Sequence, residues 1–389
     1  MRTTRRPPGH TGGRRTRGRS EPHPSRADQA GRDEPAPHIT AGTAGTVHDM
    51  RAVVYGKTGD TSVLEVVERE LPEPHWGEVR VRLAVAGVNP TDWKSRSGAT
   101  TTDLAWDEIV PGQDGAGVVD AVGGGVTGLH EGERVWLYLA QHQQPLGTAA
   151  EYTVLPADRA VRLGDASYDV GASLGVPAVT AHRALTIHEG GPSRLEPGAL
   201  EDKVVLVTGG AGAVGHAAIQ LAVWAGATVI TTVSSDEKAT LARAAGAHHV
   251  VNYRADDAAA EIKTLAPDGV DLVVEVALAE NVEVVRQVLK SGGAVSAYAD
   301  SGKRLEVPVR PLMALNARLQ FILLYSLSPA ALAAAAEDVA AAVADDALGV
   351  GEEYGLPLVR FDLEQTATAH REVENGAVGK VLIDVAELD

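Results

Sequence analysis

Three glycines in one short segment have the spacing of a phosphate-binding turn. The apolar run Val204–Val207 leads into Gly210, Gly212 and Gly215, and an apolar-periodic segment, His216 to Ala225, follows them. This order predicts a strand, a turn and a helix whose N-terminal N–H groups bind the pyrophosphate of a dinucleotide. The first glycine permits a sharp turn, the second lets the backbone approach the pyrophosphate, and the third lets the helix pack against the strand. We therefore assign pyrophosphate binding to Gly210, Gly212, Ala213, Val214 and Gly215.

The end of the next predicted strand indicates which dinucleotide is bound. An acidic residue about 20 residues after the turn usually bonds the ribose 2′-hydroxyl of NAD. Here the strand ends in Ser234, and Lys238 follows shortly after it. Hydroxyl groups and a cation suit a 2′-phosphate, so the sequence predicts NADPH. Asp236 argues against NADPH, because a carboxylate directed toward the cofactor would bind the ribose hydroxyl of NAD instead. The alternative is that Asp236 and Glu237 lie in the first turn of a helix, where carboxylates interact favourably with the helix dipole.

Composition limits the partners that this chain can have. Its 389 residues are enough for two domains, and its formal net charge of −17 argues against sequence-independent binding to nucleic acid or to an anionic membrane. It has no run of about 18 apolar residues, so we expect no membrane-spanning helix. The absence of cysteine excludes disulfides, thiolate zinc sites and cysteine nucleophiles. These features predict a cytoplasmic protein that acts on small molecules.

Residues 1–49 differ from the rest of the chain. They contain nine arginines, many Pro, Gly and Thr residues, and almost no large apolar residues. Such a segment cannot bury enough surface to offset the entropy lost on ordering, and it lacks the apolar region of a signal peptide. Two interpretations stand: a disordered basic extension, or residues translated from an upstream start codon. The strand-like sequence that begins abruptly at Met50 favours the second.

The pattern of hydrophobic residues predicts two kinds of architecture. Residues 50 to about 172 are mostly short strands separated by Gly or Pro, which suggests a small, partly closed barrel. These strands are Ala52–Tyr55, Leu64–Glu68, Glu78–Leu83, Gly117–Val122, Arg134–Leu139 and Ala150–Val154.

From about residue 173, short strands alternate with helical segments, which predicts an α/β fold with a doubly wound parallel sheet. An Ala-rich helix at Pro329–Leu348 follows, and the strand Gly379–Val385 is expected to return to the first domain. The strands of the parallel sheet are Val204–Val207, Thr228–Val233, His249–Asn252, Leu272–Val276, Ala294–Ala297 and Leu319–Tyr325.

Taken together, these features resemble the medium-chain dehydrogenase/reductase superfamily, and within it the zinc-free quinone oxidoreductases of the zeta-crystallin-like group. The resemblance runs from about residue 50 to the C-terminus and rests on the glycine turn and on residues 86–92, 111–119, 175–181 and 376–380. It implies a GroES-like β-barrel catalytic domain (residues 50–172 and 326–389) and a Rossmann NADPH-binding domain (residues 173–325). It also implies a homodimer whose Rossmann sheets join edge to edge through Leu319–Tyr325.

The resemblance also implies roles for single residues. Tyr253 matches a tyrosine that contacts the 2′-phosphate in the family, Asn281 resembles a residue near the nicotinamide, and Lys380 is expected on the cofactor side. Zinc-dependent members hold their metal with cysteine and a Gly-His-Glu segment. The corresponding stretch here is Gly112-Gln113-Asp114, so we predict no metal.

Without a Lewis acid, conjugated acceptors are easier to reduce than simple ketones, because charge spreads through the enone or quinone. We therefore expect hydride transfer from NADPH to a quinone or to the β-carbon of an α,β-unsaturated carbonyl. The candidate residues are Asn89, which bonds a carbonyl or the nicotinamide ribose, Asp92, which orients its loop, and Lys94, which donates to an enolate. Relatives tend to carry tyrosines at the positions of Lys94 and near Thr100; a solvated loop lysine is the alternative for Lys94.

Two other functions stay open: an enoyl reductase acting on a carrier- or CoA-bound intermediate, which Lys94 favours, and a catalytically idle NADPH-binding protein. The segment Gly171–Gly175 also matches the G-x-S-x-G pattern of a nucleophile elbow, but no buried strand precedes Ser173. We therefore do not assign a nucleophile to it. His182 is expected to be a helix-surface or packing residue.

Overall fold

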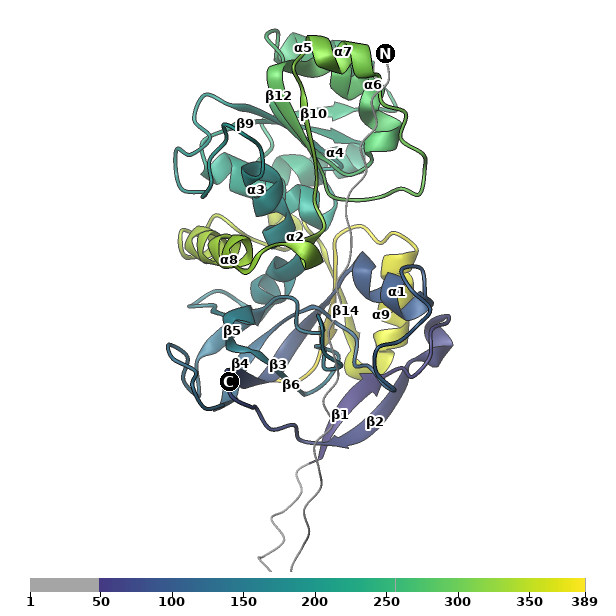
Figure 1. Ribbon diagram of the computed structural model, residues 1–389, viewed down its shortest axis with the longest axis vertical. Helices are drawn as coiled ribbons and strands as arrows, with labels where there is room; N and C mark the ends of the chain where they lie inside the picture. Colours follow the sequence, from purple (N-terminus) through teal and green to yellow (C-terminus); the bar gives the residue numbers. More distant parts are fainter. Residues whose placement is uncertain (1–48, 256, 389) are drawn as a thin grey trace, which may run out of the picture. The chain divides into compact units, whose positions relative to one another are not determined.

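The computed structural model describes residues 49–255 and 257–388. The predicted N-terminal extension therefore lies outside the described residues, apart from Asp49. The described chain contains a six-stranded parallel sheet with helices, a seven-stranded β-sheet and a two-stranded hairpin (Figure 1). This arrangement confirms the α/β fold class, with a GroES-like part and a Rossmann-type sheet.

The parallel sheet has the strand order β10-β9-β8-β11-β12-β13, the doubly wound order in which the chain starts at the centre and builds outward both ways. Its first strand, β8 (Val204–Thr208), is buried on both faces: Leu206 belongs to one hydrophobic cluster, and Val205 and Val207 belong to another. The other strands are β9 (Thr228–Val233), β10 (His249–Asn252), β11 (Val270–Glu275), β12 (Leu289–Ala297) and β13 (Arg318–Phe321). The helices between them are α3 (Ala213–Trp224), α4 (Asp236–Ala244), α5 (Ala258–Leu265), α6 (Leu278–Val288) and α7 (Val309–Ala314).

The second sheet has the order β14-β15-β3-β4-β5-β7, with β6 also paired to β3. The predicted C-terminal strand is confirmed, since β15 (Lys380–Asp384) pairs antiparallel with β3 (Glu78–Val88). The other strands of this sheet are β4 (Asp114–Val122), β5 (Arg134–Leu137), β6 (Tyr152–Pro156), β7 (Ala160–Arg162) and β14 (Leu358–Asp362). The separate two-stranded hairpin consists of β1 (Asp49–Val54) and β2 (Glu65–Glu70). Helices α1 (Pro90–Ser97) and α9 (Thr366–Glu374) accompany this sheet, with the 3₁₀ turns η1 (Thr61–Val63), η2 (Ala157–Arg159), η4 (Glu352–Tyr354) and η5 (Leu363–Gln365).

Helix α2 (Tyr168–Thr186) contacts both parts of the fold, packing against β4 and β5 and against α3. The domain boundary predicted between residues 172 and 173 therefore falls inside one helix, and the division into domains stays a prediction. Ser173 lies within this helix and donates its hydroxyl hydrogen bond to the Asp169 carbonyl. It is not on a strand-to-helix elbow.

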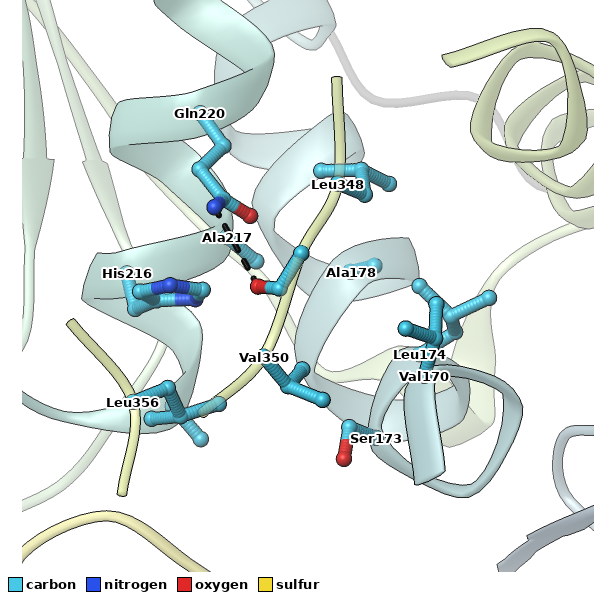
Figure 2. Close-up of a pocket in the computed structure, with 12 residues that line it drawn as sticks. Val170, Ser173, Leu174, Ala178, His216, Ala217, Gln220, Leu348, Val350 and Leu356 are labelled. Atoms are coloured by element: carbon cyan, nitrogen blue, oxygen red, sulfur yellow. Dashed lines mark hydrogen bonds between the residues drawn. The ribbon is translucent and has the colours of Figure 1, made fainter. Parts of the chain in front are cut away.

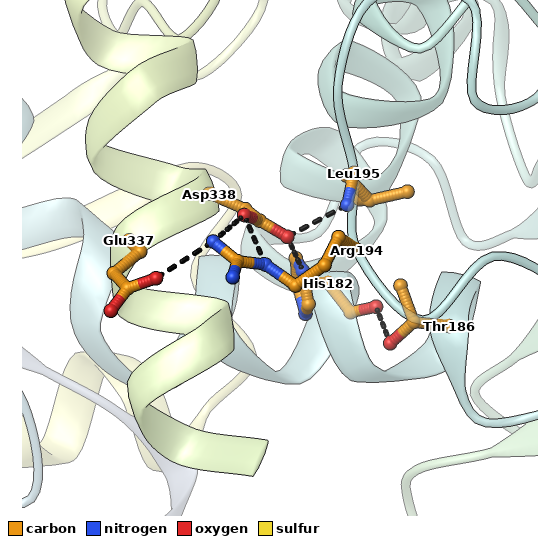
Figure 3. A network of polar contacts seen from close by, with 6 residues as sticks. All are labelled: His182, Thr186, Arg194, Leu195, Glu337 and Asp338. Atoms are coloured by element: carbon orange, nitrogen blue, oxygen red, sulfur yellow. Dashed lines mark hydrogen bonds and ion pairs between the residues drawn. The ribbon is translucent and has the colours of Figure 1, made fainter. Parts of the chain in front are cut away.

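A network of polar contacts around the buried pair His182 and Asp338 joins α2 to α8 (Pro329–Ala344) (Figure 3). His182 Nε2 lies 2.7 Å from Asp338 Oδ2, and Arg194 Nε donates to Asp338 Oδ1 at 2.7 Å. Burial opposes ionisation of Asp338, but the bonds from His182 and Arg194 and from the backbone N–H of Leu195 lower its pKa to about 2. His182 is therefore a buried packing residue that ties two helices together.

Several predicted boundaries were wrong: β3 extends to Val88 rather than Leu83, and β12 begins at Leu289 rather than Ala294. The Ala-rich helix ends at Ala344 rather than Leu348, and the last strand of the parallel sheet ends at Phe321. Leu324–Ser326 instead forms the 3₁₀ turn η3, so Tyr325 is not on a strand. None of the described helices has both the length and the apolar character needed to cross a membrane.

Candidate functional site

A cavity of about 150 Å³ lies beside the glycine turn. Three residues predicted to bind the 2′-phosphate, Ser234, Lys238 and Tyr253, line this cavity together with Gly212. The Tyr253 side chain is 50% exposed, which leaves its ring accessible to a ligand. We call this space the cofactor cavity; its lining is completed by Gly209, Ala211, Val233, Gly376, Ala377 and Val378.

One glycine of the turn, Gly210, has a different role from the one predicted for it. The left-handed residue is Gly209, with φ +71°, so the sharp turn is there and not at Gly210. A Cβ on Gly210 would lie 2.1 Å from Thr231 Oγ1, and a Cβ on Gly215 would lie 2.3 Å from the Gly209 carbonyl oxygen. Both glycines therefore serve close packing, which was predicted only for Gly215.

Gly212 leaves open space. A Cβ built on it would meet only the Gly209 carbonyl oxygen, at 3.5 Å. Gly212 is also the N-cap of α3, so Ala213 and Val214 are the first helical residues, whose N–H groups have no acceptor within the helix. An open backbone surface beside free N–H groups fits a pyrophosphate.

Asp236 and Glu237, whose carboxylates argued against NADPH as the cofactor, lie in the first turn of α4. Ser235 caps this helix by accepting from the backbone N–H of Lys238 at 3.3 Å, and Asp236 and Glu237 follow it. Asp236 Oδ1 accepts from Asn252 Nδ2 at 3.3 Å, and Asp236 is not among the residues that line the cofactor cavity. The prediction that Asp236 and Glu237 lie in the first turn of a helix is therefore confirmed, and Asp236 no longer argues against NADPH.

A second group of polar residues is buried in the catalytic part of the fold. Lys380 Nζ donates to Asn89 Oδ1 at 2.9 Å and lies 3.3 Å from Asp114 Oδ2, while Asn89 Nδ2 donates to the same Asp114 oxygen at 2.7 Å. The Lys380 and Asp114 side chains are 1% and 0% exposed. We call these three residues the Asn89 cluster. Lys380, predicted on the cofactor side, thus belongs to this cluster and does not line the cofactor cavity.

Two glycines make room for the Asn89 cluster. A Cβ on Gly87 would lie 2.9 Å from Lys380 Cε, and a Cβ on Gly175 would lie 2.1 Å from Asp114 Oδ1. The same Asp114 oxygen accepts from the backbone N–H of Val176 at 2.7 Å, next to a proline inside α2. Asp114 therefore connects β4 to α2 as well as to Asn89.

Asp92 holds the start of α1 beside the cluster. Its Oδ2 accepts from the backbone N–H of Asn89 at 2.7 Å, while its Oδ1 is buried without a partner among the described residues. Burial raises the pKa of Asp92 to about 7; the Asn89 N–H lowers it, the nearby Asp114 raises it and Lys380 lowers it. Burial also raises the pKa of Asp114, against the opposing charge of Lys380. The predicted orienting role of Asp92 is compatible with these contacts.

Two other predicted site residues lie elsewhere. Lys94 is on helix α1, not in a loop, and its Nζ lies 5.9 Å from the centroid of the Trp93 ring. Asn281, on α6, donates to Glu275 Oε1 at 2.9 Å. Neither residue lines the cofactor cavity, and their roles stay predictions.

A cavity of only about 10 Å³ lies between α2, α3 and residues 348–356 (Figure 2). His216 Nε2 donates to the Tyr354 carbonyl at 2.8 Å, and Gln220 Nε2 donates to the Gly349 carbonyl at 3.2 Å. Burial lowers the pKa of His216 to about 4, partly offset by the bond to Tyr354. A space no larger than one water molecule is part of the packing that holds α3, not a ligand site.

Sequence reasoning missed the role of Asp114. The residue was recognised only as the counterpart of a zinc ligand, and the signal for more was a carboxylate at the head of a run, Asp114–Val119, that is otherwise glycine and apolar. Across residues 49–255 and 257–388, no group of three or more His, Cys, Asp or Glu side chains is placed to hold a metal.

Comparison with known proteins places this site in a family. Residues 75–165 match the alcohol dehydrogenase GroES-like domain, and residues 213–341 match a domain described as zinc-binding dehydrogenase. The chain is 30% identical to the quinone oxidoreductase of Lama guanicoe over 345 residues, 86% of this chain and 97% of that protein. It is 33% identical to a 2-haloacrylate reductase of Burkholderia sp over 275 residues, 69% of this chain and 78% of that protein.

Among solved structures, the mycobacterial protein Rv1454c complexed with NADPH has a TM-score of 0.70 at 28% identity, covering 86% of this chain and 99% of that one. The chain belongs to the medium-chain dehydrogenase/reductase superfamily, in its zeta-crystallin-like quinone oxidoreductase group. It is an oxidoreductase of that family. With the residues that line the cofactor cavity, this identifies an NADPH-dependent reductase.

Proposed function

We propose that this enzyme reduces a quinone or an α,β-unsaturated carbonyl compound with NADPH. The observation that carries the proposal is the cofactor cavity, where a serine, a lysine and a tyrosine meet the open backbone of the glycine turn. The similar proteins from Lama guanicoe and Burkholderia sp are named for a quinone and for 2-haloacrylate. Both names describe a C=C bond conjugated to a carbonyl group, which supports acceptors of that class.

Different residues of the chain bind the cofactor and act on the acceptor. Lys238 and Ser234 bind the 2′-phosphate by charge-assisted hydrogen bonds, and the N-terminus of α3 binds the pyrophosphate. Bound NADPH supplies the hydride. The protein's task is to align the two reactants and to stabilise the negative charge that develops on the acceptor oxygen.

Asn89 is suited to this second task. Its carbonyl oxygen accepts from the Lys380 ammonium, and one N–H is donated to the Asp114 carboxylate. These two bonds fix the amide orientation and polarise it, since charged partners lie at both ends. The second N–H of the Asn89 amide is then a preorganised donor for an acceptor carbonyl or the nicotinamide ribose.

NADPH oxidation with 9,10-phenanthrenequinone, 1-octen-3-one and crotonyl-CoA tests the proposal. We expect turnover with the quinone or the enone. Turnover restricted to crotonyl-CoA favours the enoyl reductase alternative, and tight NADPH binding without turnover favours a catalytically idle binding protein. Lys94→Ala separates these further, because unchanged turnover removes Lys94 from the mechanism.

We also infer that the protein is a cytoplasmic homodimer joined at the edge of the parallel sheet. Edge strand β13 and its neighbours expose large apolar side chains: Phe321 is 67% exposed, and Met313 and Leu323 are also exposed. Exposed apolar groups beside an unpaired strand edge favour association. Light scattering of Phe321→Asp should give a monomer; a native species that is already monomeric would rule this interface out.

A further inference from the structure

Tyr325 lies where the two parts of the fold meet. It belongs to η3, four residues after the carboxyl end of β13. Ligands of open α/β sheets bind beyond the carboxyl ends of the strands. The Tyr325 ring packs against His142, with ring centroids 5.5 Å apart, so a residue that follows the parallel sheet touches the loop after β5.

The Tyr325 hydroxyl is buried and makes no hydrogen bond of ordinary geometry to any described residue. Its surroundings are polar nonetheless. Burial raises the pKa of Tyr325 well above its usual value, and the Asp92 carboxylate acts in the same direction. The Thr91 side chain, which lies within hydrogen-bonding range of the hydroxyl, opposes them. The hydroxyl therefore stays protonated across the physiological range and is available as a donor.

Two neighbouring residues also carry buried oxygens without partners in the described part of the chain: Asp92 Oδ1 and Gln113 Oε1. Gln113 precedes Asp114 of the Asn89 cluster, and its backbone N–H is close enough to lower the pKa of Asp92. An unsatisfied buried polar group costs stability, so a concentration of them points to a ligand that completes the hydrogen bonds. Of these groups, Tyr325 Oη keeps its proton throughout the physiological range, whereas Asp92 loses its proton as the pH rises through about 7.

We propose that the Tyr325 hydroxyl donates a hydrogen bond to the carbonyl oxygen of the conjugated acceptor and stabilises the negative charge that develops there. This inference rests on the proposed function, since it needs an acceptor with a carbonyl oxygen. It adds to Asn89 a second donor, contributed from the segment that follows the parallel sheet. No proton transfer from Tyr325 is required, because the high pKa favours donation of a hydrogen bond over loss of the proton.

The test compares Tyr325→Phe with a matched control, Tyr138→Phe. Tyr138 is also a buried tyrosine, but its hydroxyl donates to the Asp158 carbonyl at 2.9 Å. Tyr325→Phe should lower kcat/KM for 9,10-phenanthrenequinone or 1-octen-3-one by about 10²–10³-fold, the usual cost of removing one such donor. Its NADPH affinity, measured by fluorescence titration, and its Tm should be unchanged or raised, since the lost hydroxyl has no protein acceptor. Tyr138→Phe should do the reverse: a lower Tm with unchanged kcat/KM.

Three results would overturn the inference. If Tyr325→Phe retains kcat/KM within about twofold while the wild type is active, Tyr325 is not a donor to the acceptor, and the proposed function stands. If Tyr325→Phe lowers the Tm and the NADPH affinity together with kcat/KM, the residue is structural. If the wild type reduces none of the acceptors, the proposed function itself fails, and the inference fails with it.

Discussion

The cofactor cavity and the Asn89 cluster are built in opposite ways. The cavity takes Gly212, Ser234, Lys238 and Tyr253 from one stretch of about 40 residues, and its side chains face open space. The Asn89 cluster takes Asn89, Asp114 and Lys380 from three distant segments and excludes solvent from all of them. The two regions therefore differ in purpose: the cavity is suited to binding a ligand, and the cluster to fixing the position of the Asn89 side chain. The charge expected to hold a ligand, on Lys238, has no ion-pair partner among the described residues, whereas the charges that fix Asn89 are paired and buried.

The largest expected effect comes from breaking the buried pair. Lys380→Met leaves the Asp114 carboxylate buried without a cation, which should lower the free energy of unfolding by about 3–5 kcal/mol. Urea denaturation measures this loss. Adding Asp114→Asn to Lys380→Met should recover part of it, because the uncompensated charge is then gone.

An exposed lysine–aspartate pair provides the control. Lys290 Nζ lies 3.2 Å from Asp271 Oδ1, nearly the separation of the buried pair, but the lysine side chain is 44% exposed. Lys290→Met should therefore cost no more than about 1 kcal/mol. Equal losses for Lys380→Met and Lys290→Met would contradict the distinction between the two regions.

The next effect tests the cofactor cavity. Lys238→Ala removes a cation expected to bond the 2′-phosphate, an interaction worth about 1.5–3 kcal/mol, so the KM for NADPH should rise by roughly 10–100-fold. The KM for NADH should barely change, because NADH lacks that phosphate. Steady-state kinetics with both cofactors gives the comparison, and Lys263→Ala, an exposed lysine on α5, is the control. Equal effects on the two cofactors would defeat the phosphate assignment.

The contrast also explains how much the sequence could predict. The glycine turn, Ser234 and Lys238 are local in the sequence, so spacing predicted the cofactor from them. Tyr253 came from the family resemblance, and the distant residues Gly376, Ala377 and Val378 that complete the cavity were not predicted. Asp114 and Lys380 are 266 positions apart, and they meet because β4 and β15 both pair antiparallel with β3. No local pattern records such a pairing. The apolar pattern predicted the strand itself, but nothing in it indicated that Lys380 would contact Asn89 and Asp114.

Smaller errors had local physical reasons. The sharp turn was assigned to Gly210 because the motif counts glycines and not dihedral angles, whereas Gly209 has the left-handed conformation. The apolar run Leu319–Tyr325 was read as one strand, although its second half leaves the sheet and forms η3. That departure is what places Tyr325 next to Asp92, and hydrophobicity alone could not reveal it.

The glycine turn itself contains a residue that faces the ligand space, Gly212, and a residue that serves close packing, Gly215, so substitutions at the two can be compared. Gly215→Ala forces a Cβ to within 2.3 Å of the Gly209 carbonyl, so it should destabilise the protein by about 1–3 kcal/mol. Gly212→Ala meets no close atom and should leave Tm nearly unchanged while weakening NADPH binding. Thermal unfolding and fluorescence titration separate the two. A Gly212→Ala protein that binds NADPH normally would show that the pyrophosphate does not approach this residue.

The last prediction concerns the pH dependence of stability that the buried Asp92 carboxyl confers. Asp92 holds its proton more tightly in the native protein, with a pKa of about 7, than in the unfolded chain, where it is near 3.8. The native state therefore binds the extra proton between these values, and the contribution of Asp92 to stability falls by about 1.4 kcal/mol per pH unit as the pH rises through this window. Asp92→Asn removes this dependence, whereas Asp103→Asn, at an exposed site, should keep it. Parallel stability profiles for the wild type and Asp92→Asn between pH 4 and 7 would contradict the assignment.

The central claim is that hydride from NADPH reaches the carbon conjugated to a carbonyl group. Turnover of 1-octen-3-one with NADPH that carries deuterium at both C4 positions, followed by mass spectrometry of the product, tests it most directly. The account predicts 3-octanone with one deuterium at the terminal carbon that was the β-carbon of the enone. Deuterium at the carbonyl carbon, in an allylic alcohol product, or no transfer of deuterium at all would contradict it.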